Sequence, residues 1–351
     1  MRQFNLRYAA LKRNEYNTLR CVCAMTARPQ RTGSHYLAEV ISCSFLSRLG
    51  WLLASLTIPA LASVSAATDI LILQSHEGQP YQMAVTGFES SLANTKLDAT
   101  YQTLTLSNNS GGDALIQLLK NYHPKLIMTL GTPATHVSLA QVKAIPIVAN
   151  LVLDTDKLRE NTNATGVGLN FIASQHWLWL RRILPDARHI AVLYDPGQGT
   201  TLFKALQKQA QSEGIELIQA PVTHVDDLPS LMEDLSPQLD ALWAVNGASA
   251  YSAAAVRELL LYSFRNRVPL IGLSGQWVKA GALYALDWDY DDLGAQAAEL
   301  AKAILIKGIA PASLPPLSPR KVRAVLNMKT AEHMKLQIAE RWLPEIAEVL
   351  Q

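Results

Sequence analysis

The sequence LIMTLGTPAT at residues 126–135 joins a buried strand to the start of a helix, and this junction decides the fold. Five mostly apolar residues, 126–130, are typical of a strand that is buried on both faces. Gly131, Thr132 and Pro133 then supply a turn, a helix N-cap and a proline suited to the first helical turn. A chain that passes so quickly from strand to helix is typical of a parallel α/β sheet.

The turn at Gly131 and Thr132 predicts half of a ligand site. The first backbone N–H groups of a helix have no intrahelical acceptor, so they can bind an anionic group beyond the carboxyl edge of the sheet. The alternative is an ordinary turn whose polar groups are satisfied by the Thr132 hydroxyl and by water. Every doubly wound sheet contains several such turns.

Short apolar runs alternate with helical stretches around this turn. Strands are expected at residues 70–73, 99–106, 126–130 and 144–148, with helices at 81–93 and 113–122. This alternation predicts a parallel sheet with helices on both faces.

The same order of strands returns further along the chain. Residues 189–194, 215–220, 240–249 and 268–271 repeat the four expected strands at separations of 120, 115 and 123 residues between matched landmarks. Chance matches between similar strand–helix units are the alternative. The repeat predicts an α/β fold with two doubly wound, Rossmann-like lobes, each built on a parallel sheet.

Late segments predict a hinge between the lobes. Residues 281–286 and 322–326 are strand-like, residues 293–307 are helical, and four prolines between residues 311 and 319 favour a stiff, extended connector. A chain that crosses several times between two lobes forms a hinge and a closing cleft. The expected division is a leader at 1–66, lobe 1 at 67–170 plus about 286–318, and lobe 2 at 171–285 plus about 319–351.

The leader ends in a predicted export signal. An apolar run at residues 49–61 follows Arg48, and the small residues Val64 and Ala66 fit the cleavage rule, so we expect cleavage near Ala66 and a location in the periplasm. A buried or anchoring helix is the alternative, but the run is short for a membrane span and Pro59 interrupts it. The upstream residues 1–47 are explained either by a start at Met25 or later, or by an extension that is translated and lost.

Composition excludes several classes of function. The chain has 351 residues and a formal net charge of +2; the leader carries +6 of this, so the remainder carries −4 and has no basic footprint for nucleic acid. All three cysteines lie in the leader. The seven histidines after residue 66 show no metal-ligand spacing and are expected at the surface or in helix caps. We therefore expect no catalytic residue, no metal and no cofactor.

Polar side chains at the carboxyl ends of the expected strands form the predicted ligand site, because open sheets bind ligands there. The candidates are Ser75, His76, Glu77, Gln79, Gly131, Thr132, Asp154, Tyr194, Asp195, Asn246, Ser274 and Asp287. A zwitterion suits this set, with its carboxylate on the N–H groups behind Thr132 and its ammonium on one of the three acidic residues Glu77, Asp154 or Asp287. For each candidate a helix cap or a solvated loop residue is the alternative.

Five segments carry a resemblance to a known family: GTPA at 131–134, NATGV at 163–167, LRRILPDARHIAVL at 180–193, GALYALDWDYDDLG at 281–294 and PEIAEV at 344–349. In them the chain resembles ABC-transporter substrate-binding proteins of the type I periplasmic-binding-protein fold, which include tryptophan and tyrosine binders. The resemblance implies capture of a small polar solute, such as an amino acid or similar carboxylate, by closure of two lobes joined by a multi-strand hinge. It also implies delivery to an ABC permease with a separate ATPase subunit, so that the protein meets the membrane only through the permease.

Other functions share parts of this pattern. The same fold presents ligands to membrane sensors, and a neighbouring gene for a permease or for a sensor kinase separates the two. A transcription regulator needs a DNA-binding head where this chain has an export signal. An enzyme would turn its ligand over rather than release it unchanged. The loop SHEGQ at residues 75–79 differs from the usual loop of amino-acid binders and leaves the ligand open.

Overall fold

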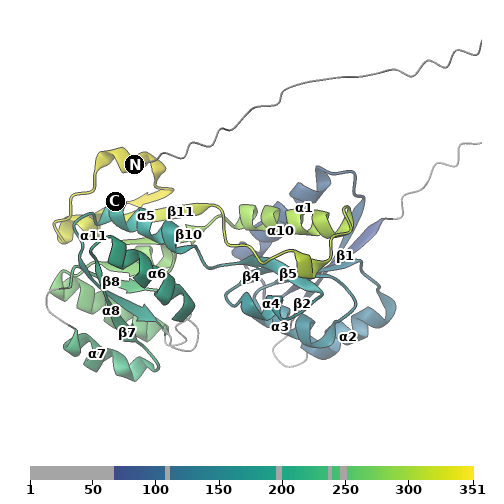
Figure 1. Cartoon of the computed structure of the whole chain (residues 1–351), viewed down its shortest axis with the longest axis horizontal. Helices are drawn as coiled ribbons and strands as arrows, with labels where there is room; N and C mark the ends of the chain where they lie inside the picture. The colour runs from purple at the N-terminus through teal and green to yellow at the C-terminus, as the bar shows by residue number, and fades with distance from the viewer. Residues whose placement is uncertain (1–66, 107–110, 195–199, 236–238, 246–250) are drawn as a thin grey trace, which may run out of the picture. The chain divides into compact units, whose positions relative to one another are not determined.

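The computed structural model describes residues 67–351 except 107–110, 195–199, 236–238 and 246–250, and it contains two α/β sheets (Figure 1). Both sheets are dominated by parallel pairing, so the expected fold class is confirmed. The leader at 1–66 and the candidates Asp195 and Asn246 lie outside the described residues.

The first sheet is parallel throughout, with the strand order β2-β1-β3-β4-β5. Its strands are β1 (Thr68–Gln74), β2 (Ala99–Thr105), β3 (Leu126–Leu130), β4 (Ile147–Val152) and β5 (Ala164–Gly168). Its helices are α1 (Gln79–Ala93), α2 (Gly111–Asn121), α3 (Thr132–Gln141) and α4 (Asp156–Arg159). All five residues of β3 are buried, as the apolar run predicts.

The second sheet has the order β12-β11-β10-β9-β8-β6-β7, and β10 and β11 pair antiparallel. Its strands are β6 (His189–Tyr194), β7 (Glu216–Pro221), β8 (Ala241–Ala244), β9 (Leu270–Gly272), β10 (Tyr284–Trp288), β11 (Val322–Asn327) and β12 (Glu348–Leu350). Its helices are α5 (Ala173–Ile183), α6 (Thr200–Ser212), α7 (Leu228–Asp234), α8 (Ala253–Asn266), α9 (Gly275–Ala280) and α11 (Met328–His333). Strands β7-β6-β8-β9-β10 repeat the order of the first sheet, which confirms the repeat expected from the sequence.

Helix α10 (Tyr290–Leu305) follows β10 of the second sheet but packs on α1, β4 and β5 of the first (Figure 1). Two glycines permit this close contact between helices. A Cβ atom on Gly294 would lie 2.0 Å from the carbonyl oxygen of Ala84, and one on Gly87 would lie 2.0 Å from that of Asp291. The chain later pairs Leu317 with Val167 of β5 and returns to the second sheet as β11. The chain therefore passes between the sheets three times, after β5, after β10 and before β11.

A charged cluster holds the segment just before β11 against the start of α10. The Arg320 guanidinium donates to the Asp292 carboxylate at 2.9 Å and to Glu299 at 2.8 Å, and the Lys321 ammonium lies 3.1 Å from Asp292. Burial alone raises the pKa of Asp292, but the hydrogen bonds from Arg320 and Lys321 outweigh it and lower that pKa. The Gln296 amide adds a bond to the Ser318 carbonyl at 3.1 Å.

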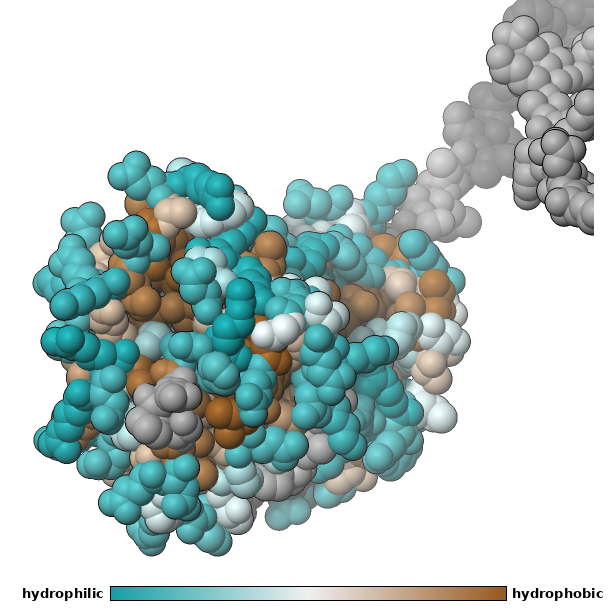
Figure 2. Space-filling view, turned by 60° about the vertical axis from the view of Figure 1, so that its left-hand side comes forward, coloured by the Kyte–Doolittle hydropathy of each residue, from teal (hydrophilic) through white to brown (hydrophobic). Residues whose placement is uncertain are grey.

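The outer surface is largely hydrophilic on the face shown in Figure 2, where apolar residues lie between polar ones. The cores lie between sheets and helices; Ile70, Met128 and Phe88 are fully buried in one of them. Among the described residues, no helix combines the length and the apolar character that crossing a membrane requires.

Candidate functional site

The carboxyl edge of the first sheet is built around Gly131. This residue is the N-cap of α3 and has a φ of 86°, a conformation that favours glycine. A Cβ atom here would lie 2.5 Å from the Tyr81 hydroxyl and 2.7 Å from the Ser75 hydroxyl. Its N–H donates to the Asn150 carbonyl at 2.9 Å, and the Asn150 amide in turn donates to the Leu293 carbonyl of α10 at 3.0 Å. The turn is thereby tied to both β4 and α10.

Ser75 caps α3, which changes the predicted anion site. The Ser75 hydroxyl accepts the Ala134 N–H at 3.0 Å and donates to the Leu130 carbonyl at 2.9 Å. Pro133 has no N–H, and the Thr135 N–H donates to the Gly131 carbonyl at 3.1 Å. The expectation that Thr132 is the N-cap was wrong, because Gly131 takes that position and Thr132 is the first helical residue. In the part of the chain that the structure describes, only the Thr132 N–H remains open at this helix start.

The cap assignment predicts different effects for two substitutions. We expect Ser75→Ala to lower the free energy of unfolding by about 1 kcal/mol, because the Ala134 N–H loses its acceptor. Thr132→Val should change it by less than about 0.5 kcal/mol, because the Thr132 hydroxyl has no partner among the described residues. Urea unfolding of both variants measures the difference in the free energy of unfolding. If Thr132→Val lowered it more than Ser75→Ala does, Thr132 rather than Ser75 would be the cap. Titration with ligand tests whether Thr132→Val weakens binding more than it weakens the fold.

The other first-sheet candidates are more exposed. The His76 ring lies against the Tyr81 ring with centroids 4.5 Å apart, and it is exposed on its other side. Glu77 and Gln79 are exposed near the start of α1. The Asp154 carboxylate is exposed and accepts the N–H of Asp156 at 3.0 Å, so it caps the short helix α4. Their roles in binding stay predictions.

The structure describes three candidates from the second sheet: Tyr194, Ser274 and Asp287. The Tyr194 ring stacks on Phe203 at 5.2 Å, and its hydroxyl lies 3.1 Å from the side-chain oxygen of Gln219 on β7. Ser274 is the N-cap residue of α9 but makes no side-chain cap. Asp287 supplies the cap instead, since its carboxylate accepts the Gly275 N–H at 2.9 Å and the Trp288 N–H at 2.8 Å.

Tyr290 lies near polar groups from both sheets. It is the first residue of α10, directly after the passage from β10. Burial, together with the nearby Asp287 and Tyr81, raises the pKa of Tyr290 to about 12. The phenol is therefore a hydrogen-bond donor at neutral pH and lies near groups that belong to different sheets. Tyr81 and Tyr290 are not among the residues predicted from the sequence; their place in the first turn of a helix after a strand could have indicated them.

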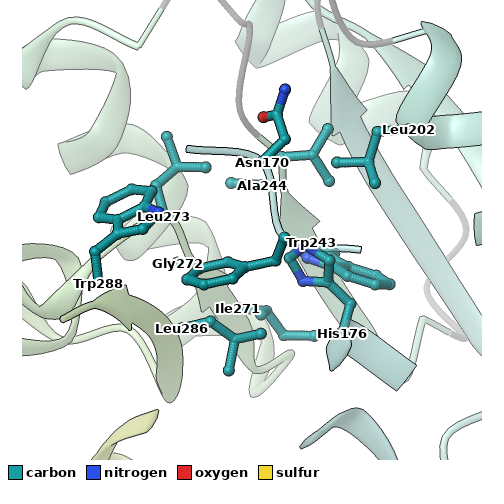
Figure 3. A pocket seen from close by; sticks show the side chains of 12 residues that line it. Asn170, His176, Leu202, Trp243, Ala244, Ile271, Gly272, Leu273, Leu286 and Trp288 are labelled. Atoms are coloured by element: carbon teal, nitrogen blue, oxygen red, sulfur yellow. The ribbon is translucent and has the colours of Figure 1, made fainter. Parts of the chain in front are cut away.

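An aromatic pocket lies at the carboxyl edge of β8, β9 and β10 (Figure 3). The Phe171 ring stacks on Trp288 at 5.8 Å with 13° between the planes, and the Trp288 indole N–H donates to the Leu169 carbonyl at 2.8 Å. The His176 ring lies 5.3 Å from Trp243 and 6.0 Å from Phe171. The remaining cavity has a volume of about 20 Å³, so the side chains leave little free space.

His176 corrects the expectation that the histidines lie at the surface or in caps. It projects from α5 into the pocket (Figure 3), and its side chain is only partly exposed. This desolvation lowers the pKa of His176 to about 4, so the ring is neutral at pH 7. Within the described ranges, no group of three or more His, Cys, Asp or Glu side chains gathers to hold a metal ion.

Comparisons with known proteins match nearly all of the described chain. The family model described as ABC transporter substrate binding protein matches residues 69–350. A tyrosine-binding protein from Clostridioides difficile is 22% identical over 224 residues, which make up 60% of this chain and 63% of the relative. The chain thus spans less than two thirds of the length of that curated relative.

Solved structures show the same fold at low sequence identity. An ABC domain in complex with L-Trp from Streptococcus pneumonia is 19% identical, with a TM-score of 0.61. The ligand-free, open structure of a substrate-binding protein with adhesive properties from Clostridium difficile is 18% identical, with a TM-score of 0.65. Each match covers 81% of this chain and 100% of the other chain.

Proposed function

The chain belongs to the family of ABC transporter substrate-binding proteins, and from this premise we propose that it is the periplasmic receptor of an ABC importer for an amino acid. The family implies a small-molecule ligand and a transporter as partner. In the proposed cycle, two lobes close over one ligand and the closed form delivers it to the permease. We take the lobes as residues 67–170 plus about 286–318 and 171–285 plus about 319–351.

The observation that carries this proposal is the combination of an aromatic pocket with nearby polar groups. Phe171, Trp243 and Trp288 offer flat apolar surface at the edge of the second sheet. Asp287 directly precedes Trp288 in β10, and the Tyr290 phenol at the start of α10 lies near the Asp287 carboxylate. A site with an aromatic part and a polar part suits an aromatic amino acid, the class of ligand in the names of two relatives.

The two ends of such a ligand would meet different groups. Its ammonium suits Asp287, whose carboxylate oxygens each accept one backbone N–H and keep a further lone pair. Its carboxylate suits the phenols of Tyr81 and Tyr290 and the open N–H of Thr132. The other predicted residues, including His76, Glu77, Gln79 and Asp154, would lie at the rim of the site.

A phenol deletion tests the polar part of the site. We expect Tyr290→Phe to weaken amino-acid binding roughly tenfold, because a hydrogen bond to a charged carboxylate is lost while the ring remains. Tyr262→Phe is the matched control, since Tyr262 lies on α8 away from the pocket and its pKa is also raised by burial. Isothermal titration measures both affinities. If the two variants bind the amino acid with equal affinity, Tyr290 does not contact the ligand.

The identity of the ligand and the compartment can be tested directly. Native mass spectrometry of protein from the periplasmic fraction, followed by a thermal-shift screen of amino acids and small anions, should reveal a ligand that raises the melting temperature. N-terminal sequencing of the same sample should place the mature start near Ala66. A broad screen without any stabilising solute would contradict the proposed binding role.

A further inference from the structure

The aromatic pocket contains polar groups that the fold leaves without a hydrogen-bond partner in the part of the chain that the structure describes. The Trp288 indole N–H donates to the Leu169 carbonyl, and the Asn170 amide N–H donates to the Leu153 carbonyl at 2.8 Å. The His176 ring nitrogens have no hydrogen-bond partner among the described residues. The neighbouring lining residues, such as Leu286 and Ile271, are apolar. Among the described residues, the Trp243 indole N–H is also without a partner, but it can only donate, whereas the His176 ring offers both a donor and an acceptor.

The chemical state of this ring limits what it can bind. A neutral imidazole has one N–H donor and one nitrogen acceptor, so it can bond a group that both donates and accepts, such as a hydroxyl. The Phe171 and Trp243 rings flank His176 and offer no charge to balance an ionic group. A carboxylate or an ammonium placed here would be desolvated without a counter-charge.

The size of the cavity also indicates that only a small group binds beside His176. Its volume of about 20 Å³ is enough for one water-sized group and not for a ring. In Figure 3 the His176 and Trp243 side chains lie side by side within the pocket, with Leu286 and Ile271 nearby. The space beside His176 therefore fits the polar end of a ligand whose larger part lies outside it.

We infer that His176 is a specificity-determining residue, which binds an uncharged polar group at the end of the ligand's aromatic side chain. This inference rests on the proposed function and narrows the ligand to aromatic amino acids that carry such a group. A ligand with a ring hydroxyl should bind about tenfold more tightly than the same ligand without it, since one hydrogen bond is gained at a desolvated site.

The experiment that tests this role of His176 uses L-tyrosine and L-phenylalanine as probes, because they differ by one hydroxyl. Isothermal titration is run on the wild-type chain and on His176→Phe, which keeps a ring and removes both nitrogens. His176→Gln is the rescue variant, because glutamine keeps a donor and an acceptor. His123→Phe is the control at an exposed histidine. Apo melting curves show whether each variant is folded.

The expected result is a tenfold preference of the wild type for L-tyrosine that disappears in His176→Phe and is partly restored in His176→Gln. Equal binding of both probes by the wild type would overturn the inference and leave the proposed function standing. Equal loss of both probes in His176→Phe would also overturn it, because His176 would then only shape the pocket. No binding of either probe to the wild type would overturn both this inference and the aromatic amino-acid assignment. If neither His176 variant folds, the inference is tested by the wild type alone: it stands only if the wild type binds L-tyrosine more tightly than L-phenylalanine.

Discussion

Gly294→Ala is expected to lower the free energy of unfolding by about 3 kcal/mol, because α10 and α1 are in backbone contact at this residue. The added Cβ atom would lie 2.0 Å from the Ala84 carbonyl oxygen and 2.7 Å from the Phe88 nitrogen. Both are backbone atoms of α1, so no change of rotamer relieves the clash and the helices must separate. The gain in helix propensity from glycine to alanine, about 1 kcal/mol, does not offset this cost.

The control for this prediction is Gly112→Ala. Gly112 lies in α2, and a Cβ atom there would meet its nearest atom, in the Gln141 side chain, at an ordinary 3.7 Å. Chemical unfolding of the two variants and the wild type gives the comparison. We expect Gly112→Ala to be neutral or slightly stabilising. If Gly294→Ala were as stable as the control, the close approach of α1 and α10 would be disproved.

Arg320→Gln is expected to lower the free energy of unfolding at pH 7 by about 2 kcal/mol. The Asp292 side chain is only 5% exposed, so losing its main partner leaves a carboxylate with little access to water. The loss should be smaller than for a fully buried pair, because Lys321 stays within 3.1 Å of Asp292 and because the Arg320 side chain is 45% exposed and screened by solvent.

The same variant predicts a dependence on pH. The folded state lowers the pKa of Asp292, so the stabilisation by Arg320 is complete above the ordinary aspartate pKa of about 3.9 and is lost as the pH falls through the lowered value. The difference between wild type and variant should therefore shrink below about pH 4. Arg159→Gln is the control, because its pair with Asp156 is exposed on both sides. A difference that is constant from pH 7 to pH 3 would contradict this role of Asp292.

Sequence patterns predicted most of the fold because they reflect burial. The run at 126–130 forms β3 with the same bounds, and residues 189–194 form β6, since each has consecutive apolar residues for a two-sided sheet. The strand expected at 144–148 is found at Ile147–Val152 because it starts after Pro146. Strand β5 was missed, since its sequence ATGVG has small residues; Gly166 lies so close to β4 that a Cβ atom would meet the Ala149 oxygen at 2.3 Å.

The candidate site was harder to predict because side chains distant in sequence decide its chemistry. The pattern at Gly131 indicated a helix start open to a ligand, but Ser75, from the loop after β1, occupies one of its N–H groups. Asp287 in the same way caps α9 from β10. His176 has no sequence signal of its own, and its neutral state follows from the aromatic rings that the fold places around it.

The position of α10 has a consequence for the order in which the chain can fold. Residues 68–168 contain every strand of the first sheet, yet the helix that covers α1, β4 and β5 begins only at Tyr290. During synthesis, the β strands of the second sheet up to β10 leave the ribosome before this cover does. The first sheet therefore keeps an apolar face uncovered until residue 305 has emerged, and fragments that end before α10 should bind chaperones or aggregate.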